Sequence, residues 1–432
     1  MGNTKRGRLE NLNRKKKQIV AYLLFFSYLC GVICAQMNDI IQYIITFLLY
    51  GNNETAKQVG YTANEAEWNH YRLVIVPNGH FGGEIVLPDL EEVKVESITL
   101  KEKTISVIKT DIIYNTFFFI SRAEELINPM RDKHGRFLAK YSILGKNNRL
   151  MIPTVDEYAR MLMKLLNLAL PTPSFSKIYL THDIDSISHF RHLRGALGGI
   201  MRGKWKDVIA SRKDIHNDPA FTFSWLIAQD KKVNGGEHIY FVKDTQGKGY
   251  DYPQYKLNGK DFETVEELIK NSGAILGLHS SYYGMDKTYV QVLTHLSNQY
   301  QPQGVCHRSH YLRCSIDNMQ SLTTFGTMHD FTMMFPDQVG FRLQTTRAVR
   351  WINPKTMQLT DLVLHPLIVM DCTLSNSNYM NLSEDEAYFE CQRLFDKVYQ
   401  NAGEIVLLWH NTIITENGYH RSLYPKLLEL LK

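Results

Sequence analysis

Cysteine is scarce in this sequence, and the cysteines present indicate neither a cysteine-bound zinc site nor a disulfide-stabilised domain. Only six of the 432 residues are cysteine, and no two of them form a CxxC pair or a zinc-knuckle spacing. A chain of this length does not need a disulfide framework to hold its core together. The cysteines are therefore expected to be reduced thiols in the core or at the surface.

Internal repeats and nucleotide-binding loops are missing as well. No motif recurs with a period of roughly 20–50 residues, and no segment is of low complexity. The glycine pairs Gly198-Gly199 and Gly235-Gly236 lack the strand, GxGxxG loop and helix order that binds a dinucleotide. A solenoid is not expected, and the glycine pairs support no nucleotide-binding site.

The excess of positive charge is concentrated at the N-terminus. The formal net charge is +5, and residues 1–36 contain seven Lys/Arg against the single acidic residue Glu10. The remainder of the chain is therefore close to neutral. Because a nucleic-acid-binding domain shows a basic face on its folded body, nucleic acid is not expected as a partner.

The same N-terminal segment has three interpretations that the sequence leaves open. Basic residues at Arg14–Lys17 precede the uncharged apolar run Ile19–Ala35, which is near the shortest length that spans a bilayer of ~30 Å. The run is either a membrane anchor or a cleaved signal, which would place the rest of the chain outside the cytoplasm. Alternatively, translation starts at Met37, where an amphipathic helical pattern begins, and the protein is cytoplasmic.

The length of the chain favours two folded units, because one hydrophobic core rarely organises so many residues. Residues 37–170 are predicted to form a small α+β domain with strands at Leu73–Val76, Glu84–Leu87, Ser97–Leu100 and Ser106–Ile108. A helix is expected from Thr154, where Thr154 and Glu157 have the spacing of a capping box. Pro171 and Pro173 end this domain, since neither can continue a helix.

Residues 174–432 alternate between strand-like and helical patterns, which is typical of an α/β fold with a parallel sheet or barrel. The predicted strands are Ile178–Leu180, His238–Val242, Ile275–Leu278, Leu362–Leu364, Leu367–Met370 and Ile405–Trp409. The predicted helices are Phe262–Asn271, Met285–Tyr300 and Ser383–Gln400.

Several of these strands end in polar residues that could share a site. Asp183 and Asp185 follow the first strand, and His279, Asp371 and His410 follow later ones. The carboxyl ends of parallel strands meet at one face of a sheet or barrel. Carboxylate oxygen and imidazole nitrogen both suit Zn²⁺ or a similar divalent ion, which activates water for hydrolysis. The alternative for either aspartate alone is that it caps the following helix.

The motifs at these strand ends resemble those of the NodB-like polysaccharide deacetylases, carbohydrate esterase family 4. The resemblance is to a divergent subgroup and covers about residues 174–432; its motifs here are Thr181-His182-Asp183-Ile184-Asp185, Gly277-Leu278-His279-Ser280-Ser281, Arg308-Ser309-His310-Tyr311 and Leu407-Leu408-Trp409-His410. It implies a distorted (β/α) barrel of the glycoside hydrolase/deacetylase type. Upstream, Phe119–Glu125 and Asp132–Arg136 look like the uncharacterised N-terminal domain that accompanies this subgroup.

The resemblance also implies roles for individual residues. Asp183 would be the catalytic base, His410 the general acid, and Arg308 the residue that orients the base. Asp185 and His279 would bind the metal, expected to be zinc. Tyr283 replaces the family's second histidine, and His310 is the candidate for the missing ligand. The residues expected to contact substrate are Tyr311, Trp409, Asn411 and Asp371.

The sequence thus predicts a hydrolase that removes an acetyl group, most directly an N-acetyl group, from a sugar of a surface polysaccharide or lipopolysaccharide. Carbohydrate is the expected substrate and partner, and membrane association through residues 19–35 is the further expectation. The alternatives are a carbohydrate-binding barrel that has lost its metal, a metal-independent C–N hydrolase, and a membrane-tethered assembly component.

Overall fold

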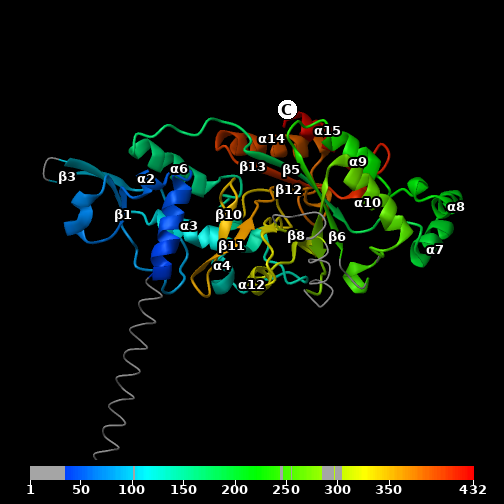
Figure 1. Cartoon of the computed structure of the whole chain (residues 1–432), viewed down its shortest axis with the longest axis horizontal. Helices are drawn as coiled ribbons and strands as arrows, with labels where there is room; N and C mark the ends of the chain where they lie inside the picture. Colours follow the sequence, from blue (N-terminus) through cyan, green and yellow to red (C-terminus); the bar gives the residue numbers. More distant parts are fainter. Residues whose placement is uncertain (1–34, 101–102, 244–246, 254, 285–295, 297–303) are drawn as a thin grey trace, which may run out of the picture.

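Two β-sheets of different size organise the chain in the computed structural model (Figure 1). The structure describes residues 35–100, 103–243, 247–253, 255–284, 296 and 304–432. The predicted helix Met285–Tyr300 lies outside this part of the chain except for Leu296, and so does the apolar run Ile19–Ala35 except for Ala35. No helix among the described residues has the length and apolar character needed to cross a bilayer.

The smaller sheet belongs to the N-terminal region and has four strands in the order β1-β2-β4-β3. Only β3 and β4 pair in an antiparallel manner. The strands are β1 (Val59–Tyr61), β2 (Leu73–Ile75), β3 (Val95–Leu100) and β4 (Lys103–Ile108).

The predicted strand at Glu84–Leu87 is wrong, because this segment is irregular. The Val86 N–H and carbonyl bond to the Tyr114 hydroxyl at 2.8 and 2.7 Å, so a side chain takes the place of a neighbouring strand.

Short helices surround this sheet. The described chain begins in a helix over 35–48, in agreement with the amphipathic pattern that starts near Met37. The helix predicted from Thr154 is present as α6, but the capping box is not: Thr154 bonds to Gln344 at 2.7 Å, and Pro153 is the capping residue. The helices are α2 (Asn53–Ala56), η1 (Glu65–His70), α3 (Ile112–Ser121), α4 (Glu124–Ile127), η2 (Ala139–Tyr141), α5 (Ile143–Lys146) and α6 (Thr154–Leu165).

The larger sheet has nine strands in the order β10-β11-β9-β8-β7-β6-β5-β13-β12, and every neighbouring pair except β10-β11 is parallel. The sheet is curled into a half-barrel, and in the described chain no pairing joins β10 to β12 to close it. The strands are β5 (Lys177–Ile184), β6 (Glu237–Lys243), β7 (Ile275–Ser280), β8 (Cys306–Ser309), β9 (His329–Asp330), β10 (Val349–Asn353), β11 (Gln358–Leu364), β12 (Val369–Met370) and β13 (Glu404–Leu408).

Helices cover the outer face of the curled sheet, and apolar side chains fill the inner face. Ile405 and Leu407 of β13 pack with the helices, whereas Val406 and Leu408 pack inside the curl. The helices of this region are α7 (Leu193–Met201), α8 (Trp205–Lys213), η3 (Ile215–Asn217), α9 (Phe223–Asp230), η4 (Gly249–Asp251), α10 (Lys260–Ser272), η5 (His310–Leu312), α12 (Ile316–Thr324), α13 (Asp371–Ser375), α14 (Glu384–Gln400), η6 (Asn411–Ile413) and α15 (Tyr419–Glu429).

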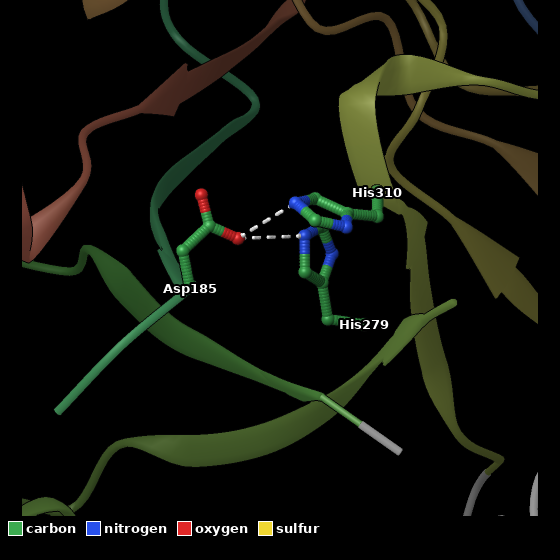
Figure 2. Close-up of side chains that lie close together, drawn as sticks. All are labelled: Asp185, His279 and His310. Carbon is green, nitrogen blue, oxygen red and sulfur yellow. Dashed lines mark ion pairs between the residues drawn. The ribbon is translucent and has the colours of Figure 1, made fainter. Parts of the chain in front are cut away.

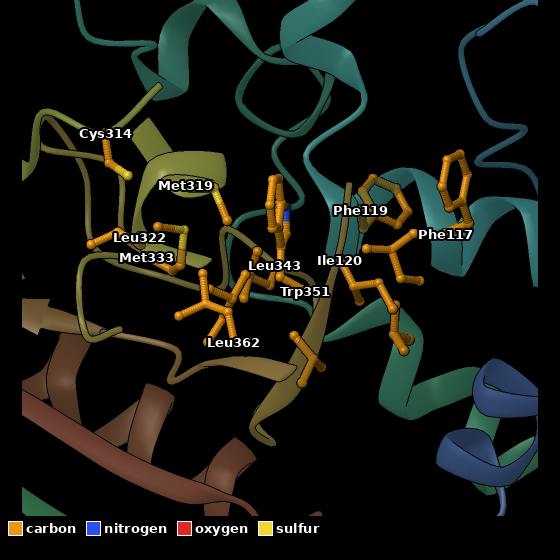
Figure 3. Packing of buried hydrophobic residues seen from close by; sticks show 14 of the residues in the cluster. Phe117, Phe119, Ile120, Cys314, Met319, Leu322, Met333, Leu343, Trp351 and Leu362 are labelled. Carbon is orange, nitrogen blue, oxygen red and sulfur yellow. The ribbon is translucent and has the colours of Figure 1, made fainter. Parts of the chain in front are cut away.

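The predicted boundary at Pro171–Pro173 lies between α6 and β5, but one apolar core crosses it. Phe117 and Ile120 of α3 belong to the same cluster as Trp351 of β10 and Leu362 of β11 (Figure 3). The indole of Trp351 donates to the Ser121 carbonyl at 3.4 Å. The N-terminal region is therefore packed against the large sheet, and the two share one hydrophobic interior.

A buried ion cluster crosses the same boundary. Arg122 forms two bonds of 2.7 and 2.8 Å to the carboxylate of Glu125, and Arg342 donates to that carboxylate at 2.6 Å. All three side chains are buried. The two arginines and one glutamate thus join the N-terminal region to the segment between β9 and β10.

Candidate metal centre

The carboxyl ends of β5, β7, β8 and β13 bring the predicted site residues into one place. Asp183 lies at the end of β5 with Asp185 just beyond it, His279 at the end of β7, and His310 and His410 directly after β8 and β13. Parallel pairing of β5 with β13 and of β7 with β8 sets these ends side by side. The convergence predicted from the strand ends is present in the structure.

Three of these side chains form a compact group that could hold an ion (Figure 2). Asp185 Oδ1 lies 3.2 Å from His310 Nε2 and 3.5 Å from His279 Nε2. Two atoms that each bind zinc at ~2.1 Å with tetrahedral angles are about 3.4 Å apart. The spacing of the three ligand atoms therefore fits a divalent ion between them.

Two atoms of this group have no hydrogen-bond partner among the described residues. Asp185 Oδ1 and His279 Nε2 are both buried, and their contacts with each other at 3.5 Å and of Asp185 Oδ1 with His310 Nε2 at 3.2 Å do not have hydrogen-bond geometry. A buried polar atom without a partner costs about 1–3 kcal/mol, so native proteins rarely leave one. Their position on either side of a common gap is what an ion-binding site requires.

Hydrogen bonds on the far side of each imidazole fix its orientation. His279 Nδ1 donates to the Arg308 carbonyl at 3.1 Å, and His310 Nδ1 donates to Asp251 Oδ1 at 2.7 Å. A carbonyl oxygen only accepts, so the proton of neutral His279 is on Nδ1 and the lone pair on Nε2 faces Asp185. Such outer partners are typical of metal-binding histidines.

Asp251 is itself held firmly. Its carboxylate accepts from the Ser281 hydroxyl at 2.6 Å and from the Tyr282 N–H at 3.0 Å, both in the loop after β7. The buried Lys243 donates to the Asp251 carbonyl at 2.9 Å. No motif in the sequence marks Asp251, because it lies in a loop far along the chain from every residue that it supports.

Charge in the group is balanced within the protein. Burial alone would lower the pKa of His310, but the carboxylates of Asp185 and Asp251 outweigh it and raise that pKa to about 9. Burial opposes the ionised form of Asp185, yet His310 and His279 hold its pKa well below the usual range. Burial also lowers the pKa of His279. The carboxylate of Asp185 is thus ionised and paired with His310, and a cation bound there would replace the proton on His310 Nε2.

Asp183 stands beside the group with a fixed orientation. Arg308 donates to Asp183 Oδ1 at 3.1 Å, and Asp183 Oδ2 lies 3.6 Å from His279 Nε2. Arg308 is fully buried over the ring of Phe241 at 4.6 Å and also donates to Thr181 Oγ1 at 2.8 Å. Arg308 does not line the pocket, so it positions Asp183.

His410 occupies the opposite side of the pocket. Its Nδ1 donates to Asp371 Oδ1 at 2.8 Å, and its Nε2 lies 3.8 Å from Asp185 Oδ2. Burial alone would lower the pKa of His410, but the adjacent Asp371 carboxylate holds it well above its usual value. Asp371 is fully buried beneath the histidine. Asp371, predicted to contact substrate, does not line the pocket; it contacts His410 and raises the pKa of that imidazole.

Trp409 and Asn411, also predicted to contact substrate, do not line the pocket. Successive residues of a strand point to opposite faces, and Trp409 points with Leu407 to the helix-covered face, where its ring stacks on Tyr424 at 4.9 Å. The Asn411 amide donates to the carbonyls of Ser186 and Ala220 at 2.9 and 2.8 Å. Both side chains are fully buried and stabilise the fold.

The pocket in front of the group has a volume of about 260 Å³. Tyr311, predicted to contact substrate, lines it. Tyr283 is 63% exposed and lies outside the candidate ligand group, whereas His310 is one of its three members. The full lining consists of Arg136, Asp183, Asp185, His310, Tyr311, Leu312, Met370, Cys372, Asn376, Tyr379 and His410.

Arg136 shows that the N-terminal region contributes to this pocket. It forms a salt bridge of 2.8 Å with Asp132 and donates to the Tyr379 hydroxyl at 2.8 Å and the Tyr311 carbonyl at 3.2 Å. The sequence showed only a polar loop at Asp132–Arg136 and gave no sign that it reaches the site. Nothing in a single sequence reports such a contact between distant segments.

Comparison with known proteins concerns the N-terminal part of the chain. No curated protein and no solved structure matches the sequence. Residues 23–171 match the model of a family of unknown function, DUF7033. The matched segment contains the small sheet, the helices around it and Arg136.

Proposed function

We propose that this protein is a metal-dependent hydrolase that removes an acetyl group, most directly an N-acetyl group, from a sugar of a surface polysaccharide or lipopolysaccharide. The observation that carries the proposal is the group Asp185, His279 and His310, with unsatisfied buried atoms next to a pocket that Asp183 and His410 also line. The acetylated sugar is taken from the resemblance to the NodB-like deacetylases.

The donor set supports a zinc-like ion. Two imidazole nitrogens and one carboxylate oxygen are the ligands of many catalytic zinc sites, which leave a position open. A divalent ion there supplies Lewis-acid polarisation of the acyl oxygen and makes water more acidic. The curled parallel sheet is compatible with the distorted barrel that this assignment implies.

Two side chains, Asp183 and His410, carry out the two proton transfers. Asp183, held by Arg308, takes the proton from the attacking water as the new C–O bond forms at the acyl carbon. His410, kept protonated by Asp371, gives its proton to the sugar nitrogen as the C–N bond breaks. The products are acetic acid, which ionises to acetate, and a free amine. Asp183 ends with one proton more and His410 with one fewer, and exchange with solvent restores both.

The test measures metal content and acetate release on the same samples of full-length protein. We expect about one bound ion per chain after zinc loading, and acetate release from N-acetylglucosamine oligosaccharides. His310→Ala should lose both properties, and Tyr283→Phe should keep both because Tyr283 is exposed.

Two outcomes would contradict the proposal. Acetate release that is equal with and without bound metal would favour a metal-independent C–N hydrolase. Oligosaccharide binding without any acetate release would favour a carbohydrate-binding barrel.

A further inference from the structure

The helical hairpin α7–α8 buries its small residues and exposes its large ones. In α7 the buried residues are Ala196 and Gly199. Leu193 and Met201 are 71% and 87% exposed, and Leu197 and Ile200 are about half exposed. A helix of a soluble domain normally turns its large apolar residues to the core. The pattern in α7 is the reverse.

Close packing between the two helices accounts for the small residues. A Cβ atom on Gly199 would lie 2.6 Å from Val208 Cγ2 and 2.8 Å from the Phe190 ring. Phe190, Ala196 and Val208 form a small core of their own. The core between the two helices therefore does not include the large apolar side chains of α7, which remain exposed.

The exposed apolar residues of the hairpin lie along one side of each helix. Leu193, Leu197, Ile200 and Met201 are spaced as neighbours along one side of a helix. On α8, Trp205 and Ile209 are 52% and 48% exposed and are one helical turn apart. Figure 1 shows α7 and α8 at the end of the molecule opposite β3.

Basic side chains are numerous on the hairpin. Residues 193–213 contain six Lys/Arg and one acidic residue, Asp207, and all seven are exposed. The basic residues are Arg194, Arg202, Lys204, Lys206, Arg212 and Lys213. The folded body therefore has a basic surface, which the near-neutral charge of residues 37–432 concealed.

We propose that the α7–α8 hairpin docks on an anionic membrane surface, with its apolar face in the headgroup region and its basic residues on lipid phosphates. Apolar and cationic side chains together on one helical element are what an interfacial helix needs, and Trp205 suits the boundary between acyl chains and headgroups. Nucleic acid would satisfy the cations but leave Leu193, Leu197 and Met201 in water.

The experiment uses the full chain and two kinds of vesicle, phosphatidylcholine alone and phosphatidylcholine with one quarter phosphatidylglycerol. We expect flotation with the anionic vesicles, and less of it at high salt. Leu197→Glu combined with Met201→Glu should weaken binding about tenfold or more, since each carboxylate opposes both insertion and the lipid charge. The matched control is Leu87→Glu with Phe389→Glu, which changes two apolar residues that are 57% and 60% exposed elsewhere.

Trp205 provides a second readout, for which the variant replaces one half-exposed aromatic ring with another. Brominated lipids should quench part of the wild-type tryptophan fluorescence, and Trp205→Phe should remove that quenched part. The proposal is overturned if the wild type binds neither vesicle, if the hairpin variant floats as well as the wild type, or if quenching is unchanged in Trp205→Phe.

Discussion

His310 donates a 2.7 Å hydrogen bond to Asp251, which lies in a loop that no sequence motif marks. The bond orients the imidazole so that its other nitrogen lies 3.2 Å from Asp185. In metal sites, loss of such an outer partner typically weakens metal binding about 10–100-fold. We therefore expect Asp251→Asn to bind zinc about 10–100-fold more weakly in a competition titration.

A control separates this effect from a general loss of negative charge. Asp361→Asn removes an exposed carboxylate that pairs with Arg350, and its zinc affinity should equal that of the wild type. Equal affinity in Asp251→Asn and the wild type would show that Asp251 does not support a ligand.

Asp371→Asn should change the pH dependence of turnover as well as its size. The Asp371 carboxylate holds the pKa of His410 well above its usual value, so His410, the proposed general acid, stays protonated at neutral pH. Without that charge the pKa falls, and activity should be lost at lower pH than in the wild type as pH rises. The pH profile of kcat measures this shift, and a profile of unchanged shape would contradict the role of His410 as acid.

Glu125→Gln should destabilise the whole chain. Burial opposes the charge on Glu125, but Arg122 and Arg342 outweigh it and lower its pKa from 4.5 to about 2. Removal of one partner from a buried ion pair costs about 3–5 kcal/mol, because the remaining charge is unpaired. Urea denaturation should show this loss, whereas Glu54→Gln, in an exposed pair with Lys57, should leave the midpoint unchanged. The stabilisation by Glu125 is present above pH 4.5 and should disappear as pH falls towards 2.

The contribution of Glu124, the neighbouring residue, to the free energy of unfolding should have the opposite pH dependence. Burial raises its pKa from 4.5 to about 7, so the folded state binds more protons than the unfolded state between these values. The free energy of unfolding should therefore fall as pH rises through this window, by about 3 kcal/mol at most. Denaturation of the wild type and Glu124→Gln at several pH values tests this, and the difference between them should not remain constant across the window.

Substitution of Trp409 should mainly lower stability, whereas substitution of Tyr311 should mainly weaken substrate binding. Trp409 is fully buried against Tyr424, so Trp409→Ala should lower the free energy of unfolding by about 3–5 kcal/mol. Tyr311 is 36% exposed and lines the pocket, so Tyr311→Ala should raise KM with a much smaller loss of stability. A large rise in KM in a folded Trp409→Phe variant would contradict its placement in the core.

The strand ends were the most informative feature of the sequence. Apolar runs such as Ile275–Leu278 and Ile405–Trp409 predicted β7 and β13 closely, and the polar residues after them do meet at one edge. Position along a strand and parallel pairing are enough to predict such a meeting. The convergence of Asp185, His279 and His410 therefore followed from local patterns.

The predictions that failed depend on contacts between distant segments. Glu84–Leu87 has a strand-like composition, but the hydroxyl of Tyr114 bonds to its backbone. Trp409 adjoins the general acid in sequence and points to the opposite face. Asp251 and Arg136 reach the site from loops whose paths depend on the packing of the whole chain, which local composition does not specify.

The cluster of Arg122, Glu125 and Arg342 also makes it unfavourable to separate the N-terminal region from the rest of the chain. A fragment beginning near residue 174 would expose apolar surface that is buried in the whole chain. The guanidinium of Arg342 would lose the carboxylate of Glu125, and the pocket would lack Arg136. The complementary fragment would keep Glu125 but lose half of its interior. Recombination at the proline-rich junction would therefore produce two defective polypeptides, and the halves are expected to be inherited together.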